Sequence, residues 1–321
     1  MNTFKNRLAT ICAVLAFVLT GVTFAQAQSK AVLAPRPSQK ASVMQSIGVT
    51  DVTITYSRPG VKARKIWGEA PPDAKLAPGA APTATLDNQN TRVKDQPIVP
   101  YGHVWRAGAN EATMFAVTDD VLINGQKLAA GTYSLHAIPT ATEWTLIFNS
   151  DAGQWGSFSY DEKKDVLRVK AKPQATADNE EWLSYSIPEV GPTSARVVLR
   201  WEKIAVPFTV EVPSVEAAYL NKVKAALVAN PADYQSLQNL AVYYAGDKKW
   251  EDALNWIDQS IKLKETFGNL ANKSNMLFNS GKKEESFTVG DQAVARGKAD
   301  KANPAAVANF EKTLAERRTA K

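Results

Sequence analysis

The residues best suited to chemistry are gathered between Val99 and Phe115. This stretch contains two glycines and six side chains that can bind or react: Tyr101, His103, Trp105, Arg106, Asn110 and Glu111. Arginine binds anions through paired hydrogen bonds, asparagine both donates and accepts, and aromatic rings offer flat surfaces to sugar rings or aromatic groups. This composition favours a binding loop next to the strand that follows. The alternative is an ordinary packed loop, in which Trp105 fills the core and Arg106 pairs with Glu111.

Two further arginines, Arg58 and Arg64, flank the turn Ser57–Gly60. If their guanidinium groups converge on Arg106, the cluster would recognise an anionic or carbohydrate ligand. The predicted ligand-binding residues are therefore Arg58, Arg64, Tyr101, Trp105, Arg106, Asn110 and Glu111.

Catalytic and metal sites are less well supported. His103, His136 and Glu111 are the ligand types for a site with two histidines and one carboxylate, but the histidines lack a short helical spacing. No serine lies in a nucleophile elbow, and no glycine-rich phosphate loop is present. We predict no metal and no cofactor, and a binding role rather than an enzymatic one. A secreted hydrolase with an unrecognised carboxylate- or histidine-dependent site remains the alternative.

Residues 1–27 have the pattern of a secretory signal peptide. Lys5 and Arg7 precede the apolar run Leu8–Val22, and Ala25–Ala27 supplies small residues for cleavage after Ala27. The run is short for a membrane span and is followed by a cleavage site. The sequence thus predicts an exported protein, periplasmic or extracellular, with no stable membrane span once the leader is removed.

Composition excludes several other classes of protein. Hydrophobic residues make up 45% of the chain and charged residues 22%, as in soluble globular domains. Cys12, the only cysteine, lies in the leader, so the mature chain has no thiol for a disulfide, a metal or catalysis. The formal net charge is +6 and falls to +4 when Lys5 and Arg7 are removed with the leader. Neither half is basic enough to suggest nucleic-acid binding.

Residues 40–213 read as an all-β domain after a mobile lead-in at 28–39. Val52–Ser57 alternates apolar and polar residues, and Asn124-Gly125 favours a two-residue hairpin turn within Val121–Leu128. Further strands are predicted at Thr132–Ile138, Glu143–Asn149, Val166–Ala171, Trp182–Ile187, Ala195–Glu202 and Ile204–Val212. Such spacing predicts an antiparallel β-sandwich or barrel. Residues 69–97 lack periodicity and are expected to form an exposed insertion or lid.

Residues 214–321 change to helical periodicity. Ser214 is a candidate helix cap, and the small and apolar positions around Leu237–Ser260 recur after 33 residues, as in tetratricopeptide helix pairs. Pro304–Arg318 would form the closing helix. A plain helical bundle is the alternative. This domain predicts a protein or peptide partner, so a scaffold or assembly role is a second possible function.

Five segments form ordered motifs: Lys40–Gly48, Thr55–Gly60, Val99–Thr113, Ala130–Ser134 and Gln154–Gly156. Together they resemble the bacterial secreted family catalogued as domain of unknown function 2911, over residues 35–212. The resemblance implies a secreted all-β domain and supplies no substrate. His103, His136 and the length of 69–97 depart from the family pattern, which weakens any mechanism that depends on either histidine.

Overall fold

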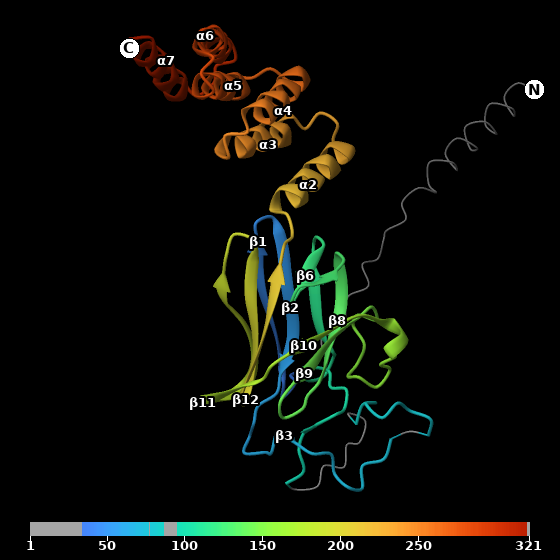
Figure 1. Cartoon of the computed structure of the whole chain (residues 1–321). Helices are drawn as coiled ribbons and strands as arrows, with labels where there is room; N and C mark the ends of the chain where they lie inside the picture. The colour runs from blue at the N-terminus through green and yellow to red at the C-terminus, as the bar shows by residue number, and fades with distance from the viewer. Residues whose placement is uncertain (1–33, 77, 87–94, 320–321) are drawn as a thin grey trace, which may run out of the picture. The chain divides into compact units, whose positions relative to one another are not determined.

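The computed structural model describes residues 34–76, 78–86 and 95–319. The predicted signal peptide, its cleavage site after Ala27, Cys12 and the first part of the lead-in lie outside these residues. The described part of the region 39–211 is rich in strands, and six helices follow it (Figure 1).

Six antiparallel strands form the larger sheet, in the order β1-β2-β5-β8-β9-β10. Their bounds are β1 Gln39–Ile47, β2 Thr50–Arg58, β5 Thr113–Val117, β8 Gly131–Ile138, β9 Trp144–Asn149 and β10 Asp165–Ala171. Val52, Ile54 and Tyr56 on β2 are all buried, as the alternating sequence predicts. A short 3-10 helix, Glu162–Lys164, precedes β10.

Four strands form the second sheet, in the order β11-β12-β6-β7. They are β11 Gln174–Val190, β12 Ser194–Glu211, β6 Val121–Ile123 and β7 Gln126–Leu128. Phe208 on β12 lies 6.2 Å from the ring of Phe115 and 6.4 Å from that of Phe148, so the two sheets share one core. The predicted antiparallel β-domain followed by helices is confirmed.

A smaller parallel pair, β3 Trp67–Gly68 and β4 Val99–Pro100, lies beside a cluster of tryptophans. The ring of Trp67 is within 5.0 to 5.6 Å of the rings of Trp105, Trp144 and Trp201. Trp105 and Trp201 stack at an interplanar angle of 14°. Because large aromatic rings bury much apolar surface, this cluster is a major part of the core.

The predicted hairpin is present: Asn124 and Gly125 have φ of +47° and +82° between β6 and β7. Three strand predictions differ from the structure. Trp182–Ile187 is only the middle of the longer strand β11. Ala195–Glu202 and Ile204–Val212 belong to one strand, β12, in which Glu202 has a positive φ of +55° where the register with β11 shifts. Such an irregularity bends a strand without ending it, so two sequence runs become one element.

The segment 69–97 is irregular where the structure describes it, and part of it packs on the β-domain. The backbone N–H of Val104 donates to the carbonyl of Thr83 at 2.9 Å, and His103 Nδ1 lies 2.9 Å from the carbonyl oxygen of Ala84. Leu86 is 8% exposed. The expected insertion is therefore anchored through residues 83–86.

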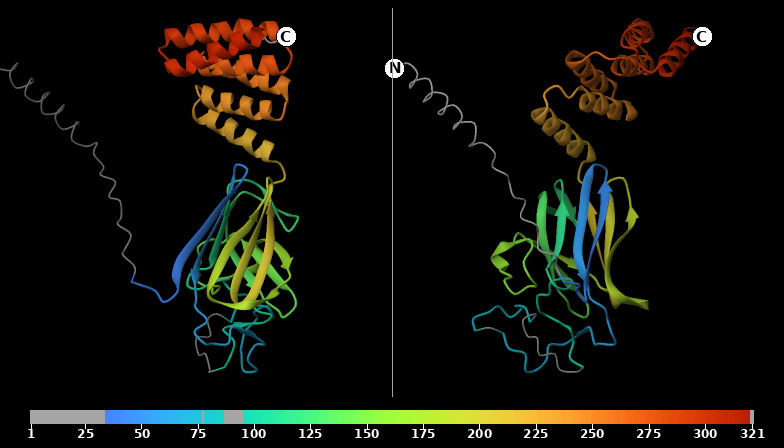
Figure 2. Two further views of the ribbon diagram at one scale, coloured as in Figure 1. Left: turned by 90° about the vertical axis from the view of Figure 1, so that its left-hand side faces the viewer. Right: turned by 180° about the vertical axis from the view of Figure 1, so that it is seen from behind.

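The carboxy-terminal region contains six helices in sequence order (Figure 2). They are α2 Val215–Ala229, α3 Tyr234–Gly246, α4 Trp250–Leu263, α5 Phe267–Asn279, α6 Lys283–Ala299 and α7 Pro304–Thr319. Ser214 caps α2, because its side chain accepts a hydrogen bond from the N–H of Ala217 at 3.0 Å. Consecutive helices contact one another along the array.

The helix pair α3–α4 is repeated by α5–α6. Tyr234 and Phe267 begin the first helices of the two pairs, and Trp250 and Lys283 begin the second helices, so both starts are displaced by the predicted 33 residues. Positions that correspond after this displacement of 33 residues are buried in both pairs: Ala241 and Ser274, Tyr244 and Leu277, Ala253 and Ser286, Ser260 and Ala293. The repeat is therefore a repeat of packing as well as of sequence.

Candidate functional site

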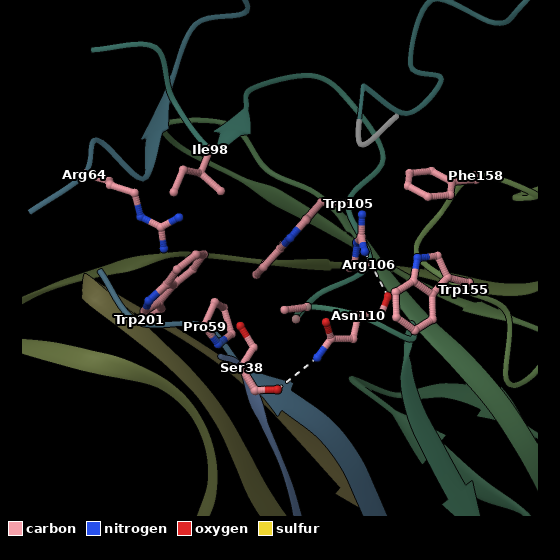
Figure 3. A pocket seen from close by; sticks show the side chains of 12 residues that line it. Ser38, Pro59, Arg64, Ile98, Trp105, Arg106, Asn110, Trp155, Phe158 and Trp201 are labelled. Carbon is pink, nitrogen blue, oxygen red and sulfur yellow. Dashed lines mark hydrogen bonds between the residues drawn. The ribbon is translucent and has the colours of Figure 1, made fainter. Parts of the chain in front are cut away.

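One pocket of about 360 Å³ lies beside the tryptophan cluster (Figure 3). Its wall comes from the ends of β-domain segments that are far apart in the chain: Ser38, Pro59, Arg64, Ile98, Trp105, Arg106, Gly108, Ala109, Asn110, Trp155, Phe158 and Trp201. We call it the arginine pocket. Its volume is within the range of small-molecule sites.

Four of the seven predicted ligand-binding residues line this pocket: Arg64, Trp105, Arg106 and Asn110. In the view of Figure 3, Trp105 lies between the two arginines. Trp105 is 4% exposed, so it fills the core, as the alternative interpretation of the loop expected, and also forms part of the pocket wall.

The structure does not bring Arg58, Tyr101 or Glu111 into the wall of the arginine pocket. Arg58 Nε instead donates to the carbonyl of Leu183 at 2.9 Å, which ties β2 to β11. The backbone N–H of Tyr101 donates to Gly68, and burial raises the pKa of its phenol. Glu111 lines a smaller neighbouring pocket. Of the three arginines, Arg64 and Arg106 therefore line the pocket, and Arg58 does not.

Arg106 is held from two sides. Its Nη1 donates to the carbonyl of Asn110 at 2.9 Å, and its Cζ lies 5.2 Å from the ring centre of Phe158. The same carbonyl accepts the N–H of Gly156 at 2.9 Å. A Cβ atom on Gly156 would lie 3.0 Å from Cζ of Arg106, so glycine is what allows the guanidinium to lie against this backbone.

Arg64 is held by its own turn. Its Nε donates to the carbonyl of Val61 at 3.1 Å, and Nη2 donates to the carbonyl of Gly60. Glu181 on β11 fixes this turn, since its carbonyl accepts the N–H of Val61 at 2.8 Å and its carboxylate accepts that of Lys62 at 2.9 Å. Both arginines are thus positioned before any ligand arrives, which lowers the entropic cost of binding.

Backbone strain is concentrated in the loops that carry the two arginines. Lys62 and Ala63 have φ of +48° and +53°, and Ala107 and Asn110 have φ of +50° and +59°. Residues other than glycine are strained in this region, and such strain persists only where surrounding contacts enforce it. The loops are therefore held in one shape by the rest of the domain.

Two side-chain hydroxyl groups hold the backbone of Ala107 in its positive-φ conformation. Its carbonyl accepts hydrogen bonds from Thr113 Oγ1 and from the hydroxyl of Tyr185, each at 2.9 Å. Burial raises the pKa of Tyr185, which keeps its phenol protonated and able to donate. A distant strand, β11, thus fixes the residue next to Arg106.

Sequence reasoning missed three aromatic members of the pocket. Trp155 and Phe158, which are 50% and 43% exposed, come from the segment between β9 and β10, and Trp201 comes from β12. Trp155 stands next to Gly156 in one of the motifs, which was a usable signal. Nothing in the sequence places Phe158 or Trp201 near the arginines, because that depends on how the two sheets pack.

The histidines considered for a metal are in separate settings. His103 contacts Ala84, whereas His136 is buried on β8 with its Nε2 3.0 Å from Ser134 Oγ. Among the residues that the structure describes, no three His, Cys, Asp or Glu side chains are grouped so that they could hold a metal ion. His103, His136 and Glu111 therefore do not form a metal site here.

Comparison with known proteins identifies a family. The model of a family described as "Protein of unknown function (DUF2911)" matches residues 38–210, which confirms the resemblance seen in the sequence. None of the curated proteins matches the chain. Across the described ranges, no helix has the length and apolar character needed to cross a membrane.

Proposed function

The chain belongs to the DUF2911 family, whose function is unknown, and we propose from the pocket itself that the protein binds an anionic ligand without transforming it. The observation that carries this proposal is that Arg64 and Arg106, held in strained loops, line one pocket of about 360 Å³ together with exposed Trp155. Guanidinium groups bind carboxylates, and an exposed indole face suits a sugar or aromatic ring. The ligand is therefore an acid that carries a ring.

The wall of the pocket favours binding over hydrolysis. The described residues that form it include no aspartate, glutamate, histidine or cysteine. General acid–base catalysis needs such a group within hydrogen-bonding reach of the reacting atoms. Arginines and asparagine supply hydrogen bonds for recognition but no base that titrates near neutral pH.

Isothermal titration calorimetry with galacturonic acid and its neutral methyl ester tests the proposal. The two probes share a sugar ring and differ in charge, so we expect the acid to bind at least about tenfold more tightly at low salt. Arg106→Gln should remove most of that difference. Arg168→Gln, on β10 in an ion pair with Asp165, is the matched control and should bind as the original protein does. Equal binding of both probes would contradict the proposal.

A second role is favoured by the repeated helix pairs. We propose that α3–α6 form a tetratricopeptide-like array that binds a protein or peptide partner, since paired helices of this kind present extended surfaces. Val242 on α3 is 47% exposed and is available for such a contact. Affinity purification with the full chain should recover a defined partner. The Val242→Asp variant should recover much less of that partner. Equal recovery by both chains would argue against this use of the array.

Export is also a proposal. The basic residues, apolar run and cleavage motif at 1–27 support secretion with removal of the leader. Amino-terminal sequencing of the protein purified from the periplasm or the medium should begin at Gln28. An intact Met1 on protein confined to the cytoplasm would contradict it.

A further inference from the structure

The insertion, residues 69–97, starts and ends beside the arginine pocket. It connects β3 to β4, and just after it the backbone N–H of Ile98 donates to the carbonyl of Lys65 at 3.0 Å. Ile98 lines the pocket and lies on the same side of it as Arg64 in the view of Figure 3. The base of the insertion is therefore fixed at one side of the pocket.

The insertion also contacts the loop that carries Trp155 and Phe158. We call residues 150–161, between β9 and the 3-10 helix, the aromatic loop. Thr85 Oγ1 lies 2.8 Å from Ser157 Oγ, in a hydrogen bond that either hydroxyl can donate. Ser157 is 0% exposed, so bulk water cannot take the place of Thr85 as its partner.

The backbone around Thr85 is itself held by the β-domain. The N–H of Val104 donates to the carbonyl of Thr83 at 2.9 Å, and the side chain of Leu86 is 8% exposed. Thr85 therefore offers its hydroxyl to the aromatic loop from a segment that is fastened on both sides.

Ser157 lies between two residues that contact Arg106. A Cβ on Gly156 would lie 3.0 Å from Cζ of Arg106, and the ring centre of Phe158 lies 5.2 Å from the same atom. In the view of Figure 3, Phe158 and Arg64 lie at opposite sides of the pocket. Because the backbone is continuous, a shift of Ser157 moves both of its neighbours and changes the wall on which Arg106 packs.

We infer that Thr85 is a positioning residue for the arginine pocket, an inference that rests on the proposed function. Its hydroxyl holds Ser157 and thereby keeps the aromatic loop in the shape that a ring-bearing acid meets. Without this hydroxyl, the ligand has to order the loop on binding, at an entropic cost that lowers affinity. The insertion is then part of the binding site, although none of its described residues lines the pocket.

Two measurements on the full chain test the inference. Hydrogen exchange read by mass spectrometry follows the aromatic loop without any ligand, and calorimetry follows the binding of galacturonic acid. Thr85→Val removes the hydroxyl and keeps the volume of the side chain. We expect faster exchange in residues 150–161 and binding that is about two- to tenfold weaker.

Two further variants serve as controls. Thr85→Ser keeps the hydroxyl and should behave as the original protein does in both measurements. Thr145→Val, on β9, removes a hydroxyl that accepts a hydrogen bond from Lys170 at 3.1 Å, and it should change neither measurement. If Thr85→Ser behaves as Thr85→Val does, packing of the methyl group and not the hydroxyl holds the loop, and the inference is overturned.

Ser157→Ala tests the pairing of the two hydroxyls. If they act through one hydrogen bond, adding Thr85→Val to Ser157→Ala should weaken binding by a smaller factor than Thr85→Val does alone. Fully additive effects would mean that the two side chains act separately, which would contradict the inference. Melting temperatures of all variants exclude unfolding as the cause of a loss.

The outcomes distinguish this inference from the proposed function. Unchanged exchange of the aromatic loop in Thr85→Val overturns the inference, whether or not the acid binds. Faster exchange with unchanged affinity overturns it as well, because the hydroxyl then has no effect on the pocket. If the original protein does not bind galacturonic acid and the loop of Thr85→Val still exchanges faster, the proposed function fails and the restraint of the loop by Thr85 stands.

Discussion

The hydroxyl of Tyr185 donates a hydrogen bond of 2.9 Å to the carbonyl of Ala107, although the two residues are 78 positions apart. Ala107 has a φ of +50° and directly follows Arg106. Because Tyr185 lies on β11 and is 4% exposed, the second sheet fixes the loop that presents an arginine to the pocket. The site is thus positioned by the sandwich as a whole.

Tyr185→Phe should lower the free energy of unfolding of the β-domain by about 1 kcal/mol, the typical contribution of one buried hydrogen bond. Thr113 still donates to the carbonyl of Ala107, so the loop should keep its fold while losing part of its rigidity. Urea denaturation followed by tryptophan fluorescence measures the change. Stability equal to that of the original protein would show that the hydroxyl does not restrain the loop.

The same tyrosine predicts a dependence on alkaline pH. Burial raises the pKa of Tyr185 in the folded protein, whereas the unfolded chain has the ordinary value of about 10. A raised pKa contributes stability that is complete below pH 10 and is lost as the pH rises toward the folded value. Stability should therefore fall above about pH 10, and less steeply in Tyr185→Phe. Equal slopes of unfolding free energy against pH in the original protein and in Tyr185→Phe would show that Tyr185 is not the cause of the loss.

Gly156→Ala should weaken binding at the arginine pocket. Its φ is +66°, and an added Cβ would lie 3.0 to 3.2 Å from three guanidinium atoms of Arg106, which must then move. Gly125→Ala is the control, because its φ of +82° gives similar strain but its Cβ would meet nothing within 4 Å. Both variants should lose about 1 kcal/mol of stability, and only Gly156→Ala should lose affinity for galacturonate. Equal affinity in the two variants would contradict the packing of Arg106 on this glycine.

Trp144→Ala should be among the most destabilising substitutions in the β-domain. Trp144 is 1% exposed and its ring lies 5.0 Å from that of Trp67, so its removal leaves a large cavity that costs about 3–5 kcal/mol. Trp182→Ala removes a ring that is 41% exposed and should cost much less. Thermal unfolding of the two variants compares them. Similar losses would mean that the tryptophan cluster is not a main part of the core.

The packing of α7 on α6 can be tested with two glycine substitutions that should change stability in different directions. A Cβ on Gly290 of α6 would lie 2.6 Å from Leu314 of α7, and such overpacking costs about 1–3 kcal/mol. Gly246, at the end of α3, has nothing within 4 Å of the added atom. Gly290→Ala should therefore lower the melting temperature read by far-ultraviolet circular dichroism, while Gly246→Ala should leave it unchanged or raise it. A higher melting temperature for Gly290→Ala would mean that α7 is not packed on α6 at this point.

Much of the fold could be predicted from local patterns. Strict alternation identifies β2, and Asn124-Gly125 identifies the hairpin, because each pattern depends on residues close in sequence. The edge strand β1 was not predicted from its pattern, since its side chains are mostly exposed or half-buried and give little hydrophobic contrast. The predicted strands Ala195–Glu202 and Ile204–Val212 form the single strand β12 because Glu202 stays paired with β11. That pairing joins residues far apart in sequence, so local patterns do not reveal it.

The site could be predicted only in part. Arg64, Trp105, Arg106 and Asn110 lie in loops whose composition signals binding, and the structure brings them together. Arg58 has the same chemistry, but it donates to β11 instead, and only the packing of the two sheets shows which arginine faces the pocket.

The most direct test of the pocket as a binding site is a crystal structure of the protein with trigalacturonate. The account predicts one sugar carboxylate within hydrogen-bonding distance of the guanidinium of Arg64 or Arg106, with its ring against Trp155. A trimer bound elsewhere on the protein, with the arginine pocket unchanged, would contradict it.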